Sequence, residues 1–313
     1  SSLWRQSRLK RQEGSGMNGI LNIYKEAGFT SHDAVAKLRG ILKQKKIGHT
    51  GTLDPDAEGV LPVCIGNATK LCGLLTEKEK TYEAVLLLGQ ETDTQDISGK
   101  ILRIAEVTVS PEAVREVIWS FRGSYEQVPP MYSALKVNGK KLYELAREGK
   151  EVERKARTVF LREISVSDIR LPEVSFAVTC SSGTYIRTLC RDIGEKLGCG
   201  GCMKKLLRTR VDRFDIKGSL RLSQIEEKMA AGRIGDCLIP VDSIFEQYLE
   251  VRMKEEGDRF VYNGNSFTEG LTCRGKKTET AKGDPVRVYD SKGGFVGLYR
   301  YERGMFRPVK MFL

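Results

Sequence analysis

The sequence predicts an α+β protein with a mixed central sheet, followed by a small C-terminal module of β-barrel type. Segments with strand-like alternation are interspersed irregularly with segments of helical periodicity over most of the chain. From about Tyr248 the pattern changes to short strands separated by glycine turns, as in a small barrel. A chain of 313 residues exceeds the usual single-domain length, so one larger and one smaller domain are expected.

The first elements can be placed from their caps and periodicity. A short strand is expected at 20–24, and Thr30 or Ser31 can cap a helix. That helix has one apolar face, formed by Ala34, Val35, Leu38, Ile41 and Leu42. Residues 48–66 contain four glycines and two prolines and have no regular pattern. Irregular backbone between well-patterned elements is where functional residues tend to lie.

The remaining elements follow the same logic. Ser110 before Pro111 indicates a helix start, and an amphipathic helix follows Gly183. Further strands are expected at 81–88, 174–179, 284–289 and 294–301. Two basic segments interrupt this pattern, an insertion at 123–157 with a short helix around 141–147, and a run at 204–213.

The charge of the chain favours a polyanionic partner. The formal net charge is +11, and residues 1–16 contribute four Lys or Arg and one Glu without any apolar periodicity. We interpret residues 1–16 as a disordered extension or a cloning remnant; removing their +3 from +11 leaves a basic folded part of +8. Nucleic acid is the first candidate partner. Membrane spans are not expected, because no apolar run reaches the roughly 18 residues required.

Eight cysteines bear on metal binding and on the cellular compartment. Only Cys199 and Cys202 have C-x-x-C spacing, and the two histidines, His32 and His49, lie far upstream. A structural zinc site needs four ligands. We therefore expect buried or incidental reduced thiols and no metal, with zinc as the less favoured alternative. No secretory signal follows Met17, which favours a cytoplasmic protein.

The segment G-H-T-G-T-L-D-P at 48–55 is the most informative in the chain, and it contains Asp54. Taken alone, Asp-Pro is a common turn starter. Four other segments accompany it: K-T-Y at 80–82, G-Q-E-T-D-T-Q-D at 89–96, P-P-M-Y-S-A-L-K at 129–136 and G-T-Y-I-R-T-L at 183–189. In order and spacing these segments resemble the TruB-type bacterial tRNA pseudouridine-55 synthases, from about residue 19 to 245.

This resemblance implies a fold and a reaction. The fold is that of pseudouridine synthases, a mixed, mostly antiparallel central sheet with flanking helices, at 17–246. A PUA-like RNA-binding module is expected at 247–313, although the tail matches that pattern only loosely. The reaction isomerises uridine-55 in the tRNA T-loop by breaking the C1′–N1 bond and forming a C1′–C5 bond. It needs no cofactor, because no atoms are gained or lost and no redox change occurs.

The resemblance also assigns roles to residues. Asp54 matches the family's catalytic carboxylate, which can add to C6 or C1′ or steady an oxocarbenium-like centre. Arg187 matches the arginine that pairs with it, with a surface arginine at a helix start as the alternative. Asp96 is expected to orient Arg187 from the other side. Tyr82 matches the aromatic residue that stacks on the target base, where simple packing is the alternative.

The remaining matches concern RNA binding. The target uridine must leave the T-loop stack, and His49 matches the residue that contacts the RNA there; a structural histidine is the alternative. Lys70, Lys80 and Tyr185 match positions around the pocket, with Lys70 as a polar or phosphate contact. The basic insertion corresponds to a segment that closes over the T-arm, although a solvated helix is the ordinary interpretation of such a charge run. The run at 204–213 can supply a second contact strip.

Several departures and competing hypotheses remain. Thr52 stands where many relatives have alanine. Nothing resembles the extra segments of guide-RNA-dependent relatives, so we expect a stand-alone enzyme, and the absence of heptads favours a monomer. One alternative is an RNA-binding or folding factor that acts on the T-arm elbow without essential catalysis. Another is a nucleosidase or glycosyl hydrolase that uses Asp54.

Overall fold

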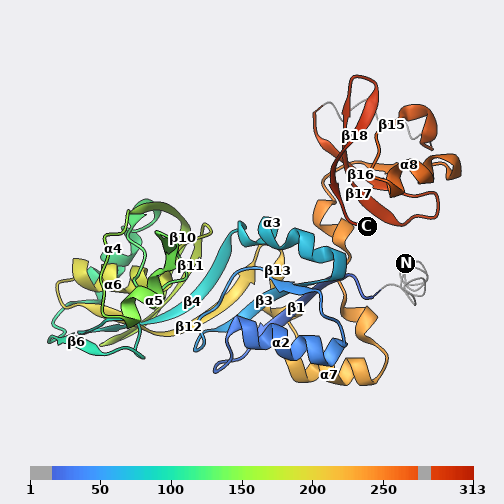
Figure 1. The fold of residues 1–313 in the computed structure, drawn as a ribbon. Coiled ribbons are helices and arrows are strands. Elements are labelled where there is room, and N and C mark those ends of the chain that lie inside the picture. The colour runs from blue at the N-terminus through green and yellow to red at the C-terminus, as the bar shows by residue number, and fades with distance from the viewer. Residues whose placement is uncertain (1–15, 274–282) are drawn as a thin grey trace.

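The computed structural model describes residues 16–273 and 283–313 and is organised around a large mixed sheet (Figure 1). Its main path runs through β1 (Gly19–Lys25), β3 (Glu58–Ile65), β12 (Gly201–Val211), β4 (Lys80–Leu88), β11 (Glu173–Cys180), β10 (Arg157–Arg170) and β7 (Gly123–Gln127). Two short strands extend it, with β2 (Ile47–His49) on β3 and β13 (Phe214–Asp215) on β12. Within the described residues β12 and β3 form this sheet's parallel pair and its other pairs are antiparallel, which confirms the mixed, mostly antiparallel prediction.

Helices cover the two halves of this sheet separately. Helix α2 (Ser31–Leu42) and helix α7 (Leu222–Ala230) pack beside each other against β1, while α4 (Pro111–Trp119) and α6 (Ile186–Lys196) pack on β10, β4 and β12. The predicted caps are confirmed: the Thr30 hydroxyl accepts from the Asp33 backbone N–H, and Ser110 caps α4 with Pro111 in its first turn. Each helix pair buries its own apolar cluster.

The opposite face of β1 and β3 is buried differently. Successive residues alternate between clusters, with Ile20 in one and Leu21 in the other, because side chains in a strand point to opposite faces. On this second face lie a 3₁₀ segment at Gly66–Leu71 and α3 (Cys72–Thr76), above the sheet in Figure 1, whereas α2 and α7 lie below it. Phe245, Leu298 and Phe312 complete this cluster, so the C-terminal module packs directly on the large sheet.

The C-terminal module is a curled five-stranded sheet, as expected for a PUA-like module. Its order is β14 (Glu250–Arg252), β16 (Pro285–Tyr289), β17 (Phe295–Glu302), β18 (Met305–Met311) and β15 (Phe267–Thr268), and α8 (Asp258–Tyr262) precedes β15. An isolated bridge joins Met253 to Thr272, so the two ends of the sheet approach each other. Its own core includes Val251, Val288 and Tyr299.

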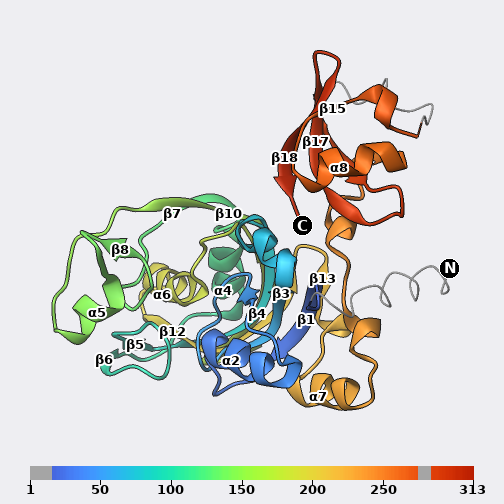
Figure 2. The same cartoon turned by 45° about the vertical axis from the view of Figure 1, so that its right-hand side comes forward.

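One sequence-based boundary requires correction. The expected insertion at 123–157 begins with β7 and ends in β10, which both belong to the large sheet, because their alternating side chains fit its edge. The inserted part is therefore 128–156, with the hairpin β8 (Lys136–Val137) and β9 (Lys140–Lys141) and the helix α5 (Leu142–Arg147) (Figure 2). Most of the basic run at 204–213 is the central strand β12, in which Arg208 is 1% exposed whereas Lys205 is exposed. The suggested role of this run as a second contact strip stays a prediction.

A second hairpin pairs β5 (Gln90–Thr92) with β6 (Ile101–Ile104). No helix in the described part of the chain is long and apolar enough to cross a membrane. The expectation for residues 1–16 falls almost entirely outside the described residues, of which Gly16 is the first.

Candidate active site

Asp54 lies in the irregular loop between β2 and β3, and buried neighbours fix this loop on both sides. Leu53 is 3% exposed, and its backbone N–H donates to the Ser31 hydroxyl at 2.9 Å, while that hydroxyl donates to the Leu53 carbonyl at 3.3 Å. Thr50 is fully buried, and both its N–H and its hydroxyl donate to the Pro62 carbonyl. The loop is irregular but held in place.

Lys25 fixes the other end of the loop. Its ammonium donates to the backbone carbonyls of Glu26, Phe29 and Pro55, and burial lowers the pKa of the amine. The side chain of Asp54 itself remains 40% exposed. A fixed backbone with an accessible carboxylate suits a group that must meet a substrate in one orientation.

Arg187, near the start of α6, pairs with this carboxylate. Its Nε lies 2.8 Å from Asp54 Oδ2, and the side chain is only 7% exposed. The terminal nitrogens donate to the carbonyls of Thr94 at 3.0 Å and Tyr132 at 2.9 Å. The contact therefore differs from a bidentate Arg–carboxylate pair, because both terminal nitrogens of the guanidinium donate to backbone carbonyls of other segments. One guanidinium thus joins the Asp54 loop, the turn after β5 and the insertion.

A second buried guanidinium supports the loop from β12. Arg208 donates from Nε to the Val60 carbonyl at 2.8 Å and from a terminal nitrogen to the Gly51 carbonyl at 3.1 Å. Its backbone crosses close to Gly59, where an added Cβ would lie 2.1 Å from the Arg208 carbonyl oxygen. Gly59 also has φ +112, so only glycine permits this parallel crossing of β12 and β3 beside the Asp54 loop.

Two tyrosines lie near the Asp54–Arg187 pair. Tyr82 on β4 is 7% exposed and is paired in register with Arg208, and Tyr185 directly precedes α6. Burial raises the pKa of both hydroxyls, and the charge of Asp54 contributes in the same direction, which places both rings within its electrostatic range. Both phenols are therefore protonated at neutral pH.

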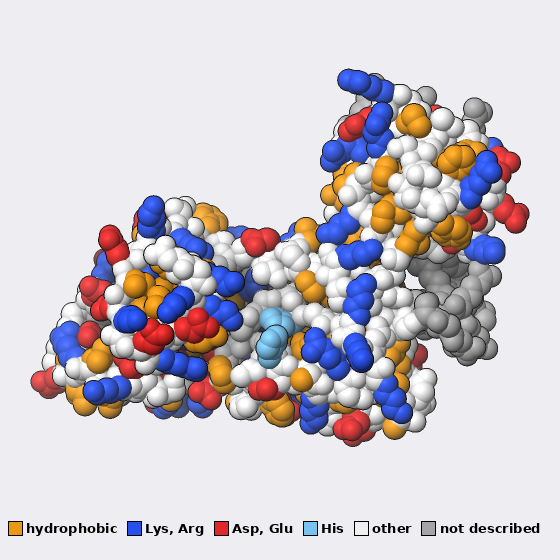
Figure 3. Space-filling model, viewed as in Figure 1, with side chains coloured by type: hydrophobic (Ala, Val, Ile, Leu, Met, Phe, Trp, Pro, Cys, Tyr) orange, Lys and Arg blue, Asp and Glu red, His pale blue; other side chains and the backbone are white. Residues whose placement is uncertain are grey.

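His49 and Lys80 flank this region. Burial lowers the pKa of His49, assisted by the nearby charges of His32 and Arg208, and its Nδ1 is buried without a partner among the described residues. The ammonium of Lys80 donates to the carbonyls of Thr76 and Lys78, and burial lowers its pKa to about 8. Figure 3 shows the two histidines in pale blue on this face, with Lys and Arg side chains on either side.

Of the predicted site residues, Asp54, Asp96 and Arg187 line the pocket beside Asp54, whereas the lining does not include His49, Lys70, Lys80, Tyr82 and Tyr185. The Lys70 ammonium donates to the carbonyls of Met311 and Leu313 in the C-terminal module. Asp96 lines that pocket, yet within the described residues its carboxylate binds the Thr94 and Ser98 hydroxyls and the Ser98 N–H instead of Arg187. Asp96 thus shapes the turn whose Thr94 carbonyl holds Arg187.

The pocket at this site has a volume of about 260 Å³. Asp54, Arg187 and Asp96 line it together with Tyr132 and Tyr143 from the insertion and residues 203–206 of β12. Sequence reasoning did not single out Ser31, Lys25 and Arg208 as supports, nor the Tyr132 carbonyl. Only Tyr132 carried a usable signal, because it lies in the matched segment at 129–136.

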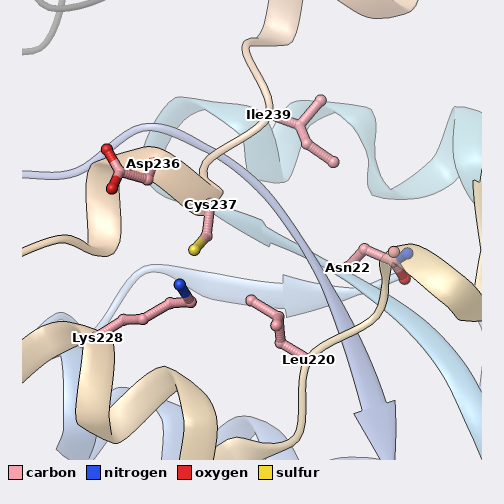
Figure 4. Close-up of a pocket in the computed structure, with 7 residues that line it drawn as sticks. Asn22, Leu220, Lys228, Asp236, Cys237 and Ile239 are labelled. Carbon is pink, nitrogen blue, oxygen red and sulfur yellow. The ribbon is translucent and has the colours of Figure 1, made fainter.

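A second pocket of about 300 Å³ lies between β1 and the segment after α7. Asn22, Leu220 and Ile239 line it together with the polar groups of Lys228, Asp236 and Cys237 (Figure 4). None of the predicted site residues belongs to its lining. Metal ligation has no candidate either, because no group of three or more His, Cys, Asp or Glu side chains with suitable geometry occurs in residues 16–273 and 283–313.

Comparison with known proteins gives consistent matches. A model of the TruB family pseudouridylate synthase N-terminal domain matches residues 39–186, and one of the tRNA pseudouridylate synthase B C-terminal domain matches 187–246. The tRNA pseudouridine synthase B of Lachnoclostridium phytofermentans is 54% identical over 307 residues, covering 95% of this chain and 100% of that protein. The protein of the same name from Clostridium kluyveri is 44% identical, covering 95% and 100%.

Solved structures show the same fold. A crystal structure of a Cbf5–Nop10–Gar1 complex matches with a TM-score of 0.69 at 27% identity, covering 94% of this chain and 85% of that chain. An H/ACA RNP bound to a substrate RNA containing 2′-deoxyuridine matches with a TM-score of 0.68 at 25% identity over the same shares. Two family models covering most of the chain, and relatives this similar over nearly full length, show that the chain belongs to the TruB family of pseudouridylate synthases.

Proposed function

We propose that this enzyme converts uridine-55 in the T-loop of tRNA to pseudouridine, with Asp54 as the catalytic carboxylate. One observation carries the proposal: the partly exposed Asp54 carboxylate lies 2.8 Å from the buried Arg187 and faces a pocket. The relatives at up to 54% identity bear the name tRNA pseudouridine synthase B, which supports tRNA as the substrate. The basic character of the chain, at +11, fits a polyanionic substrate.

The reaction assigns a task to each group at the site. The C1′–N1 bond breaks, the uracil turns, a C1′–C5 bond forms, and the proton on C5 is exchanged for one on N1. A carboxylate can carry the intermediate by adding to C6 or C1′ or by steadying positive charge at C1′. Arg187 holds Asp54 in position through this sequence. The proposal requires no cofactor.

We assign Tyr82 and Tyr185, which lie within electrostatic range of Asp54, to stacking against the everted base. Base–aromatic stacking contributes roughly 1–3 kcal/mol per base and offsets part of the few kcal/mol that base flipping costs. Because the pKa of Tyr82 is raised, its hydroxyl is a proton donor at neutral pH and not a strong base. We assign His49 and Lys80 to contacts around the flipped nucleotide, and the lowered pKa of His49 favours its neutral form there.

The insertion and the C-terminal module complete the proposed RNA surface. Residues 128–156 contribute Tyr132 and Tyr143 to the pocket, so a segment rich in Lys and Arg borders the reacting nucleotide. We assign 17–246 to catalysis and 247–313 to RNA binding. The enzyme is proposed to act as a monomer without a guide RNA, in the cytoplasm, where its eight free cysteines remain reduced.

Replacement of the carboxylate tests the proposal. Asp54→Asn keeps the shape of the side chain, so we expect pseudouridine formation to fall by at least about 10³-fold while tRNA affinity stays within a few-fold. The measurement is pseudouridine mapping in unmodified tRNA, with binding measured separately and Asp168→Asn, on the exposed end of β10, as the control. Persistent pseudouridine in the Asp54 variant refutes the assignment. Release of free uracil by the unaltered enzyme indicates a nucleosidase instead.

A further inference from the structure

A buried glutamine that was not among the predicted site residues hydrogen-bonds to the backbone two positions before Arg187. Gln127 is the last residue of β7 and is 1% exposed. Its Oε1 accepts from the backbone N–H of Tyr185 at 2.8 Å, and its Nε2 donates to the carbonyl of Tyr185 at 3.0 Å. A single side chain thus pairs with both backbone groups of one residue, as a neighbouring strand would.

This pairing occurs where α6 lacks other support. Tyr185 is the N-cap residue of α6, and no side chain caps this end. The Tyr185 N–H precedes the helix and has no intrahelical acceptor, so an outside acceptor is required to satisfy it. Arg187 follows two residues later, where the position of its guanidinium depends on the path of this first turn.

The orientation of the Gln127 amide is itself fixed. Its Nε2 also donates to the Tyr125 hydroxyl, two residues earlier on the same face of β7. Burial raises the pKa of Tyr125, and the charge of Asp192, on the second turn of α6, contributes in the same direction. The Tyr125 hydroxyl thus accepts from Gln127 and lies within the electrostatic range of Asp192, so these residues link β7 to both the start and the second turn of α6.

We propose that Gln127 is a positioning residue that fixes Tyr185 and the first turn of α6, and thereby aims Arg187 at Asp54. This inference rests on the proposed function, because its readout is the isomerisation step. A displacement of about 1 Å at a catalytic group can reduce the rate by about 10²-fold.

Gln127→Glu tests the hydrogen bond that the Gln127 amide donates to the Tyr185 carbonyl. A carboxylate can still accept from the Tyr185 N–H, but it cannot donate to that carbonyl. We expect kcat at pH 8 to fall by about 10-fold or more, with KM for tRNA within about 3-fold, since phosphate contacts dominate binding. Burial raises the pKa of the new carboxyl above its usual value of about 4.3, and its protonated form restores the donor. The ratio of variant to wild-type kcat should therefore rise by about 3-fold or more as the pH falls from 8 to 5.5.

Gln224→Glu on α7 is the matched control. Its Oε1 accepts from the Arg221 N–H, and its amide nitrogen has no protein partner in the described structure, so loss of the donor should change neither kcat nor the pH profile. A Gln127 variant with wild-type kcat and a flat ratio overturns the inference.

Tyr125→Phe provides an independent test of the same inference if the Gln127→Glu variant does not fold. Removing the hydroxyl that orients the amide should lower kcat by a few-fold at unchanged tRNA affinity. An unchanged kcat in this variant also overturns the inference. Failure of the wild-type enzyme to form pseudouridine would instead overturn the proposed function, so the two failures are distinguishable.

Discussion

The Asp54 loop and the insertion at 128–156 are both irregular and border the same pocket, but they are attached to the protein differently. The Asp54 loop is held by buried side chains from three elements, including Ser31, Lys25 and Arg208. The insertion makes many of its hydrogen bonds within itself, such as the Tyr143 N–H to the Ser133 carbonyl. Irregular backbone is therefore not equivalent to mobile backbone, and the side chains that satisfy it determine which applies.

Arg187 joins the two regions, so its removal should have the largest effect. Arg187→Met takes the cation from Asp54 and the donors from the Thr94 and Tyr132 carbonyls. We expect kcat/KM for pseudouridine formation to fall by about 10³-fold, equivalent to about 4 kcal/mol of transition-state stabilisation. Single-turnover kinetics on unmodified tRNA measures this, with Arg170→Met on the exposed end of β10 as the control. Near-normal turnover would show that Asp54 acts without its partner.

Lys80 is buried beside the Asp54 loop near Gly51, so the attachment of this loop should be visible in how folding stability depends on pH. Its pKa of about 8 in the folded state lies below its ordinary 10.5, so between these values the unfolded state binds the extra proton. Stability should therefore rise with pH across this window, by up to about 1.4 kcal/mol per pH unit from this group. Urea unfolding at several pH values should show that the Lys80→Met variant lacks this component. Parallel pH curves for the variant and wild type would contradict it.

Ser31 tests whether side chains hold the Asp54 loop. Ser31→Ala removes the hydroxyl that serves both backbone groups of Leu53, leaving them buried and unsatisfied. The free energy of unfolding should fall by about 1–3 kcal/mol, and kcat should fall because the Asp54 backbone is released. Denaturant unfolding and pseudouridine assays on the same preparation check both effects. Ser120→Ala, at the exposed end of α4, should change neither.

Substitutions in the insertion should weaken tRNA binding and leave the free energy of unfolding almost unchanged. Lys136→Gln combined with Lys140→Gln removes two exposed cations from its hairpin. We expect tRNA affinity to fall several-fold and the salt dependence to flatten by roughly 0.7–0.9 per lost phosphate contact, with stability within about 0.5 kcal/mol of wild type. Binding titrations at several salt concentrations measure this, with Lys217→Gln as the control. An unchanged salt slope would remove these lysines from the RNA surface.

The sequence predicted regular elements well where local rules applied. The helix at 31–42 followed from Thr30 and its apolar spacing, and α4 followed from Ser110 and Pro111. The same approach did not show how the side chains of 204–213 are distributed, because a count of basic residues does not reveal which face of a strand each side chain takes. Arg208 is buried against carbonyl groups, whereas Lys205 on the same bulged strand is exposed.

Local sequence was sufficient to predict the two proposed catalytic residues, because Asp54 and Arg187 lie in distinctive segments that match a known family. The 2.8 Å pairing of these residues, 133 positions apart in the chain, depended on how β2, β3 and α6 come together in three dimensions. Tertiary structure alone also brought the Lys70 ammonium to a carbonyl of the C-terminal module and the Gln127 side chain to the backbone of Tyr185. Backbone hydrogen-bonding partners leave no pattern in local sequence, because any residue can offer a carbonyl or an N–H, and only the assembled fold determines which of these groups must be satisfied.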